Sequence, residues 1–245
     1  KADAVYFPSC ISRTMGSPPG EAPDLSPTQA MLALTHRAGL NLFIANDIAG
    51  TCCGVPFSSK GYDEAHRISV NRAIERFWEW SEQGRLSIVV DTSPCTYGFR
   101  TCRPYLDPEN QKRFDAMSIL DSIEFAYDEL LPRLTVRRKV GTIALHPVCS
   151  LTKMNLTAKL EAIGKACSGS VFIPPNSGCC GFAGDRGFLF PELTESATKE
   201  QGAEVQAKNF DGYYSSSRTC EIGMTRAVGQ NYRSYLHLLE QATRE

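Results

Sequence analysis

Residues 4–10 read Ala-Val-Tyr-Phe-Pro-Ser-Cys, an apolar run that breaks at a proline and then delivers a cysteine. Residues 140–149, Val-Gly-Thr-Ile-Ala-Leu-His-Pro-Val-Cys, follow the same plan. A short apolar run that is rich in β-branched and aromatic residues and is bounded by proline predicts a buried strand. Both stretches therefore place a cysteine, Cys10 or Cys149, just beyond the end of a strand.

The elements after Cys10 are predicted from helix caps and apolar runs. Ser26 as N-cap, Pro27 at the first helical position and Gln29 in a capping box predict the start of a helix. The predicted order is a helix at Pro27–Ala38, a strand at Leu40–Ala45, a loop with Cys52-Cys53-Gly54, a helix at Asp63–Glu82 and a strand at Leu86–Val90 that runs into Cys95.

The same order recurs after Cys149. It comprises a helical face over Leu156–Cys167, a strand at Val171–Ile173, a loop with Cys179-Cys180-Gly181, a helix from Pro191 to about Lys208 and a strand at Phe210–Ser216 that runs into Cys220. This repetition predicts an α/β fold of two pseudo-repeated halves, each a small, mostly parallel sheet flanked by helices. Sites in such sheets gather at the carboxyl ends of the strands, so we expect one cysteine pocket in each half.

The chain of 245 residues can hold one large or two small domains. We predict a first half at residues 1–117, a connecting helix and linker at 118–139, and a second half with a C-terminal helix at 140–245. Residues 100–117 are predicted as a loop, 118–131 as an amphipathic helix, and 230–243 as the C-terminal helix.

Charge and hydropathy exclude several classes of protein. Lys plus Arg number 26 and Asp plus Glu number 27, which argues against a general nucleic-acid binder because such proteins carry a basic excess. The longest apolar runs fall well short of the ~20 residues of a transmembrane helix, and no signal segment opens the chain. We expect a fragment of a longer cytoplasmic protein, with a peripheral position at the inner face of the membrane as a further option.

Eight of the ten cysteines form a double series. Each half has a single Cys, a Cys-Cys-Gly and a Cys-x-x-Gly. The candidate ligand sets are Cys10, Cys52, Cys53 and Cys95 in the first half, and Cys149, Cys179, Cys180 and Cys220 in the second.

Three kinds of chemistry use clustered cysteines. A disulfide framework is typical of small secreted chains, and adjacent cysteines bridge each other badly. Structural zinc more often uses Cys pairs two to four residues apart. Adjacent thiols point apart and suit separate irons of an iron–sulfur cluster, and the glycine after each pair allows a tight turn beside it. A cluster in each half is our leading interpretation, and zinc in one or both halves is the next.

Other residues near these sets are weighed as secondary candidates. His146 is a possible metal ligand or outer-shell hydrogen-bond donor, and a backbone-bonded histidine is the equal alternative. Cys102 as a fifth ligand is the less favoured alternative to a core or loop cysteine, and Cys167 is expected in the core. Asp185 and Arg186 form either an ion pair that closes a loop or part of a docking surface.

The double series resembles the CCG-type cysteine-rich domain pair of heterodisulfide reductases, which also occurs in iron–sulfur components of glycolate oxidase and anaerobic glycerol-3-phosphate dehydrogenase. More narrowly, residues 91–98 (Asp-Thr-Ser-Pro-Cys-Thr-Tyr-Gly) and 216–223 (Ser-Ser-Arg-Thr-Cys-Glu-Ile-Gly) are similar to the C-terminal part of bacterial FAD-linked D-lactate dehydrogenases. The resemblance implies that the two sets ligate iron–sulfur clusters of the 4Fe–4S type. It also implies that a flavin domain, carrying FAD, and a ferredoxin-type cluster domain lie on parts of the enzyme outside this chain.

By that resemblance the chain passes electrons from the flavin toward a quinone or cytochrome and carries no lactate site of its own. Gly98 and Gly223 depart from the heterodisulfide reductase pattern because they stand where its fifth cysteine would be. The departure puts heterodisulfide-reductase-like thiol chemistry in doubt. It leaves a zinc-binding or metal-free docking module as the main alternative to an electron-transfer module.

Overall fold

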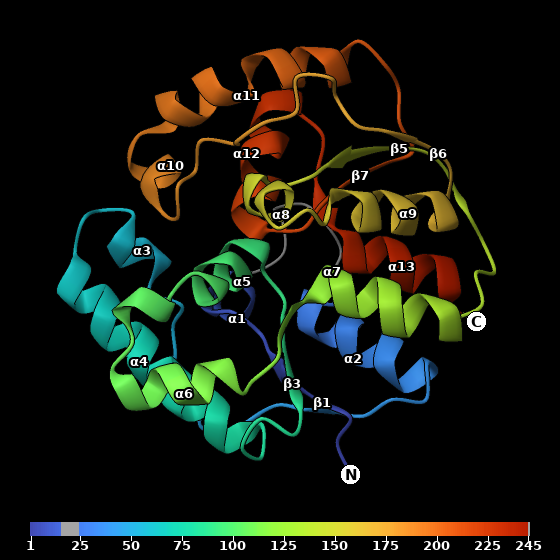
Figure 1. Ribbon diagram of the computed structural model, residues 1–245. Coiled ribbons are helices and arrows are strands. Elements are labelled where there is room, and N and C mark those ends of the chain that lie inside the picture. The colour runs from blue at the N-terminus through green and yellow to red at the C-terminus, as the bar shows by residue number, and fades with distance from the viewer. Residues whose placement is uncertain (16–24, 245) are drawn as a thin grey trace.

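Two four-stranded parallel sheets form the frame of the protein, as Figure 1 shows. The computed structural model describes residues 1–15 and 25–244. The first sheet has the order β2 (Leu42–Phe43), β1 (Ala4–Phe7), β3 (Ser87–Val90), β4 (Ile119–Asp121), and the second has β6 (Ser168–Phe172), β5 (Val140–His146), β7 (Gly212–Ser215), β8 (Arg233–Ser234). Each described pairing is parallel. The prediction of two pseudo-repeated α/β halves is confirmed.

The helices repeat in the same order as the strands. The first half has α1 (Cys10–Thr14), α2 (Pro27–Arg37), α3 (Val55–Ser58), α4 (Asp63–Trp80), α5 (Ser93–Arg100), α6 (Pro108–Asp115) and α7 (Ser122–Phe125). The second half has α8 (Cys149–Lys153), α9 (Thr157–Cys167), α10 (Arg186–Leu189), α11 (Pro191–Gln206), α12 (Arg218–Val228) and α13 (Tyr235–Thr243). The start of α2 is as predicted, since Ser26 and Gln29 form a capping box.

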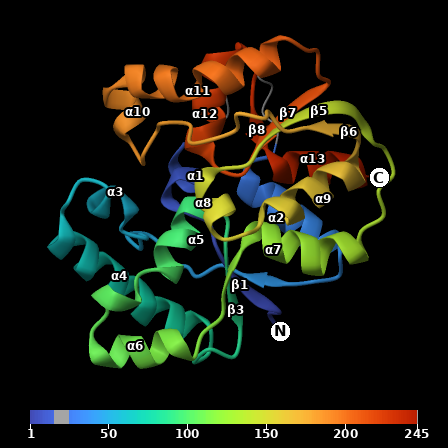
Figure 2. The same ribbon diagram turned by 45° about the horizontal axis from the view of Figure 1, so that its top comes forward.

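The two halves share a layer of helices. In Figures 1 and 2, α2, α7, α9 and α13 lie between the two sheets, while α4 and α6 cover the outer face of the first and α11 that of the second. The C-terminal helix α13 packs on both α2 and α9. One hydrophobic cluster accordingly contains buried residues of both halves, among them Tyr6, Leu34, Leu145 and Leu239. A half separated from its partner would expose this cluster to water.

The segment between the halves differs from its prediction. Residues 118–131 contain the edge strand β4, the four-residue helix α7 and a π-helical turn at Ala126–Leu130, rather than one long helix. Asp121 ends the strand by capping α7 through the backbone N–H of Ile123, at 3.0 Å. Residues 100–117, predicted as a loop, contain α6. A three-residue strand shows too few alternations to give a period, so only its pairing with β3 reveals it.

Among the residues that the structure describes, no helix has the length and apolar character needed to cross a membrane.

The shared helix layer predicts one cooperative unfolding transition for both halves. Leu34 on α2 is fully buried in the shared cluster, so Leu34→Ala should lower the free energy of unfolding by about 2–5 kcal/mol. Leu32 on the same helix is 37% exposed, and Leu32→Ala should change that free energy by no more than about 0.5 kcal/mol. Chemical denaturation followed by circular dichroism measures both. Two separate transitions in the wild-type protein would contradict a shared core.

Candidate functional site

Strand ends and helix starts position the single cysteines. Cys10 and Cys149 are the first residues of the short helices α1 and α8, which follow β1 and β5. Cys95 and Cys220 lie in the first turns of α5 and α12, which follow β3 and β7. Because unpaired N–H groups and the positive end of the dipole lie at a helix N-terminus, this position favours a thiolate.

The Cys-Cys-Gly loops reach the same sheet edges from β2 and β6. Gly54 and Gly181 adopt the left-handed conformation, with φ of 73° and 74°. The turn aims the backbone N–H of Gly54 at Sγ of Cys52 and that of Gly181 at Sγ of Cys179, each at 3.4 Å. A side chain at Gly181 would place its Cβ 2.6 Å from the carbonyl oxygen of Leu193. Both glycines are therefore required by conformation and by space.

The four thiols of the first half lie together. Sγ of Cys53 is 3.2 Å from Sγ of Cys95, and the Cys10 thiol hydrogen-bonds to Cys52. Cys52 accepts hydrogen bonds from the thiols of Cys10 and Cys53 and from Gly54, which lowers the pKa of Cys52 far below that of a free thiol. The pKa values of Cys10 and Cys53 are raised, first because they donate to Cys52 and then because they are buried. The set is arranged to carry negative charge on Cys52.

The second half repeats this arrangement. Sγ of Cys180 is 2.9 Å from Sγ of Cys220, and Cys149 hydrogen-bonds to Cys179. Cys179 corresponds to Cys52, since hydrogen bonds from Cys149 and Cys180 strongly lower its pKa. The contact with Cys180 lowers the pKa of Cys220 to about 6, and His146 contributes less in the same direction. All ten cysteines are free thiols, so the structure contains no disulfide framework.

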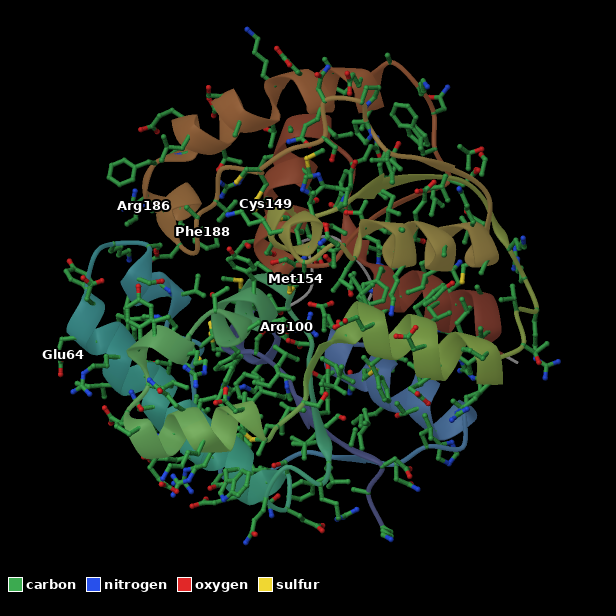
Figure 3. All side chains as sticks on the ribbon, viewed as in Figure 1. Glu64, Arg100, Cys149, Met154, Arg186 and Phe188 are labelled. Atoms are coloured by element: carbon green, nitrogen blue, oxygen red, sulfur yellow. The ribbon has the colours of Figure 1, made fainter. Side chains whose placement is uncertain are left out.

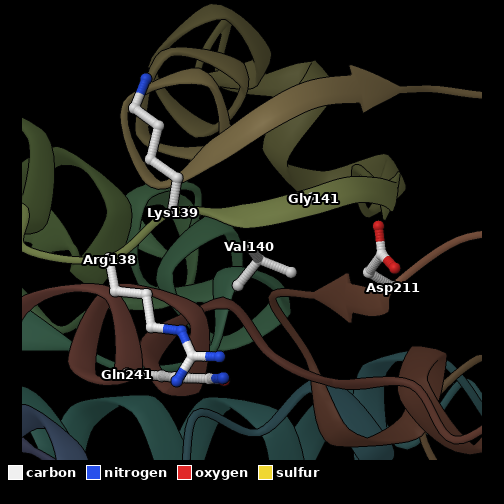
Figure 4. Close-up of a pocket in the computed structure, with 6 residues that line it drawn as sticks. All are labelled: Arg138, Lys139, Val140, Gly141, Asp211 and Gln241. Atoms are coloured by element: carbon white, nitrogen blue, oxygen red, sulfur yellow. The ribbon is translucent and has the colours of Figure 1, made fainter.

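Both sets open onto one cleft of about 490 Å³ between the halves. Residues that line it include every cysteine of the two sets except Cys52. Figure 3 shows Cys149 on α8 between the halves, with Phe188 at the same opening. The smaller hollow in Figure 4 has a volume of about 260 Å³, lies at the amino end of β5 beside Asp211, and is lined by no cysteine. The two predicted pockets thus face each other across one space.

Two polar contacts connect the halves at the rim of this cleft. Nζ of Lys60 lies 2.7 Å from the carboxylate of Asp185, and the guanidinium of Arg186 donates to the carbonyl oxygen of Ser59 at 2.8 Å. Asp185 and Arg186 therefore each bind the opposite half, and of the two alternatives weighed from the sequence the ion pair between them is not formed. Because both groups of the Lys60–Asp185 pair are partly exposed, it contributes less than about 1 kcal/mol.

The donor set suits a thiolate-ligated centre in each half. Four thiols meet at each site, and buried His146 beside the second set makes no hydrogen bond with either ring nitrogen. Within the described residues, no three His, Cys, Asp or Glu side chains are already placed around the position of a single metal ion. Sulfur donors of this number and kind suit iron–sulfur clusters and zinc alike. The role of the eight cysteines as ligands stays a prediction.

Residues 4–100 and 143–225 match the family model described as "CCG: Cysteine-rich domain". The chain belongs to the CCG cysteine-rich domain family. The two matched segments coincide with the two copies of the strand-and-cysteine pattern, so the resemblance expected from the sequence is confirmed.

Two curated relatives of this CCG protein are proteins of oxidoreductase or lactate metabolism by name. One component of the anaerobic glycerol-3-phosphate dehydrogenase of Escherichia coli (strain K12) is 23% identical over 194 residues, covering 71% of this chain and 48% of the relative. Lactate utilization protein A of Oceanobacillus iheyensis is 24% identical over 203 residues, covering 78% of this chain and 80% of the relative. The chain thus spans about half the length of the first of these.

Among solved structures, glutamate racemase from Aquifex pyrophilus overlaps 97% of this CCG protein and 81% of its own chain, with a TM-score of 0.40 and 15% identity. A similarity this weak carries no information about function.

The remaining cysteines lie away from the cleft. Cys102 is 1% exposed within the outer cluster of the first half, and Cys167 is fully buried in the shared cluster. Burial raises the pKa of each thiol to about 12, and no other thiol contributes to either shift. The structure places Cys102 as a core residue and gives no support to a fifth ligand. Arg100 at the end of α5 pairs with Glu124 at 2.5 Å.

The Cys-Cys-Gly turn of this CCG protein can be tested at Gly181. We expect Gly181→Ala to lower the free energy of unfolding by more than about 1 kcal/mol, since alanine is strained at positive φ and its Cβ meets backbone. Gly178→Ala in the same loop is the matched control, because its Cβ would have only an ordinary contact at 3.9 Å. Equal effects of the two substitutions in urea denaturation would show that the turn is not constrained.

Proposed function

We propose that this CCG protein is the iron–sulfur electron-transfer module of an oxidoreductase that acts on D-lactate or a similar 2-hydroxy acid. Each half would hold one 4Fe–4S cluster, ligated by Cys10, Cys52, Cys53 and Cys95 or by Cys149, Cys179, Cys180 and Cys220. Family membership and the names of the relatives support the coarser role of an iron–sulfur module that serves an oxidoreductase. The choice of D-lactate is supported by the resemblance of residues 91–98 and 216–223 and by the lactate utilization relative.

The observation that carries this proposal is the convergence of four thiols, twice, on one cleft. Iron–sulfur clusters take thiolate ligands on separate irons and exchange single electrons with little rearrangement of the protein. Two such sites that line the same cleft would allow electrons to pass between the halves.

The residues of this chain would prepare each site for an anionic centre. Gly54 and Gly181 aim N–H groups at Cys52 and Cys179, and such hydrogen bonds stabilise negative charge on sulfur. Cys53 and Cys95 are buried, as are Cys180 and Cys220, so the inner side of each site is shielded from water. This shielding protects a cluster from hydrolysis and leaves the cleft side open for electron exchange.

A redox path needs a donor and an acceptor, and the chain spans only about half of the dehydrogenase component that it matches. We propose that a flavin domain with FAD takes the hydride from the hydroxy acid. A ferredoxin-type cluster domain of the same enzyme would pass electrons to this module, and a quinone or cytochrome would receive them. A quinone acceptor would place the module at the inner face of the membrane.

The cluster assignment predicts a stoichiometry. Protein prepared without oxygen should contain about eight iron and eight sulfide ions per chain, as two 4Fe–4S clusters require. Cys52→Ala and Cys179→Ala should each lose about half of both, and their electron paramagnetic resonance spectra should each lack a different signal. Cys167→Ala, in the core and away from the cleft, should retain the full content. Wild-type protein that holds zinc, or no metal, after anaerobic preparation would contradict the proposal.

A further inference from the structure

The two halves differ at the residue that ends the central strand. Phe7 pairs with Val90 in the first sheet, and His146 pairs with Ser215 in the second. Phe7 and His146 therefore occupy equivalent positions, and each is followed three residues later by the first cysteine of its set. The pseudo-repeat thus has an apolar ring in one half where the other has an imidazole.

Packing accounts for the phenyl ring of Phe7 but not for the imidazole of His146. Phe7 packs against Phe77, Trp80 and Phe99 at ring-centroid distances of 5.1, 6.4 and 5.8 Å. His146 has no exposed surface, neither of its ring nitrogens has a hydrogen-bond partner of good geometry, and the polar group nearest to it is the Cys220 thiol, whose pKa it lowers. An imidazole buried without a partner costs free energy relative to an apolar ring of similar size. The ring is suited to a better acceptor on the side of Cys220 than the thiol alone provides.

The imidazole of His146 faces the second cysteine set. The imidazole lies close enough to Cys179 and Cys220 to lower the pKa of both thiols. From α8, Lys153 acts on Cys149 in the same direction. The groups that most affect the pKa values of Cys10, Cys52 and Cys53 are thiols, burial, backbone N–H groups and one hydroxyl, with no cation or imidazole among them.

A buried carboxyl group adds to the difference. Asp91, immediately after β3, accepts a hydrogen bond at 2.9 Å from the backbone N–H of Ser9, the neighbour of Cys10. The equivalent residue after β7 is Ser216, which carries no charge. The second half has a buried carboxyl group of its own, Glu221 beside Cys220, and the guanidinium of Arg218 pairs with it at 3.1 Å. The carboxyl group behind the first site is thus held by hydrogen bonds from Ser9 and Thr92, whereas the one beside the second site is paired with a cation.

We propose that His146 donates a hydrogen bond from its ring to a sulfur of the second centre and thereby makes that centre the easier of the two to reduce. The inference rests on the proposed function, because it needs a cluster in each half. Reduction adds one negative charge to a cluster, so a donor directed at its sulfurs stabilises the reduced state and raises the reduction potential.

The consequence is a direction for electron flow. When one electron passes between the halves, the first centre is oxidised by one electron, the second is reduced by the same electron, and no proton moves. A flavin, or dithionite in the test tube, supplies the electron. Solvent reaches the second set more readily, since Cys149 and Cys179 are exposed whereas Cys10 and Cys52 are only partly so. Electrons therefore collect at the half from which they can leave the protein.

The test gives the second half the residue type that the first half has at the equivalent position, by replacing His146 with phenylalanine. His146→Phe and His146→Gln are each combined with Cys52→Ala, which removes the first centre so that the second is measured alone. Potentials are determined by anaerobic redox titration followed by electron paramagnetic resonance. His146→Phe should lower the equilibrium constant for reduction of the second centre about tenfold, or about 59 mV for a one-electron couple. His146→Gln retains an N–H donor and should keep most of the wild-type value.

Controls separate this inference from the proposed function. His36→Gln, on the exposed side of α2, should leave the potential unchanged. Iron and sulfide are measured on every sample. Wild-type protein without iron would overturn the proposed function and this inference with it. Iron retained in His146→Phe with an unmoved potential would overturn only the inference.

A third variant covers a failure of His146→Phe to fold or to keep its iron. Lys153 is exposed, so Lys153→Met should not perturb folding, and it should lower the same potential by less than His146→Phe because water screens its charge. The decisive comparison is then between Cys52→Ala and Cys179→Ala, each of which keeps one centre. If the potential of the second centre does not lie above that of the first, the inference is wrong.

Discussion

Burial of one layer of helices between two parallel sheets is the constraint on which the rest of the structure depends. Helices α2, α7, α9 and α13 share a hydrophobic cluster drawn from both halves, and the C-terminal helix packs on a helix of each half. Neither sheet can cover its inner face without the other. This arrangement turns the carboxyl ends of the two sheets toward one cleft, so the cysteines that follow the strands meet across it.

Within that frame, the sites are made by short-range geometry that is the same in both halves. A glycine at positive φ turns each Cys-Cys pair and directs an N–H group at its first sulfur. The second sulfur of each pair contacts a cysteine in the first turn of a helix. Thiols in contact share protons unevenly, so the first thiol of each Cys-Cys pair favours the charged form while the second thiol of the pair and the single cysteine of α1 or α8 hold their protons. A centre that binds separate thiolates can use all four.

The departures from symmetry lie around these sites rather than in them. Asp91 behind the first set is held by hydrogen bonds, whereas Glu221 beside the second set is paired with Arg218, and His146 and Lys153 lie beside this more exposed set. The two sets of four sulfurs therefore lie in two different electrostatic environments. Two redox centres of one kind in unlike surroundings have unlike potentials, and a difference in potential gives electron transfer a direction.

The sequence by itself determined the elements whose signals are local. Apolar runs that end at proline, the capping box at Ser26 and the doubled Cys-Cys-Gly pattern were enough to predict both halves, the parallel sheets and the eight cysteines that gather. Strand β4 was missed because its three residues are defined by pairing with β3, and the link between Asp185 and Lys60 was missed because its partners lie 125 positions apart. Only the tertiary structure decided that the two sites share a cleft and that His146 is buried without a partner. Those properties arise from contacts between distant segments, which no local pattern of residues encodes.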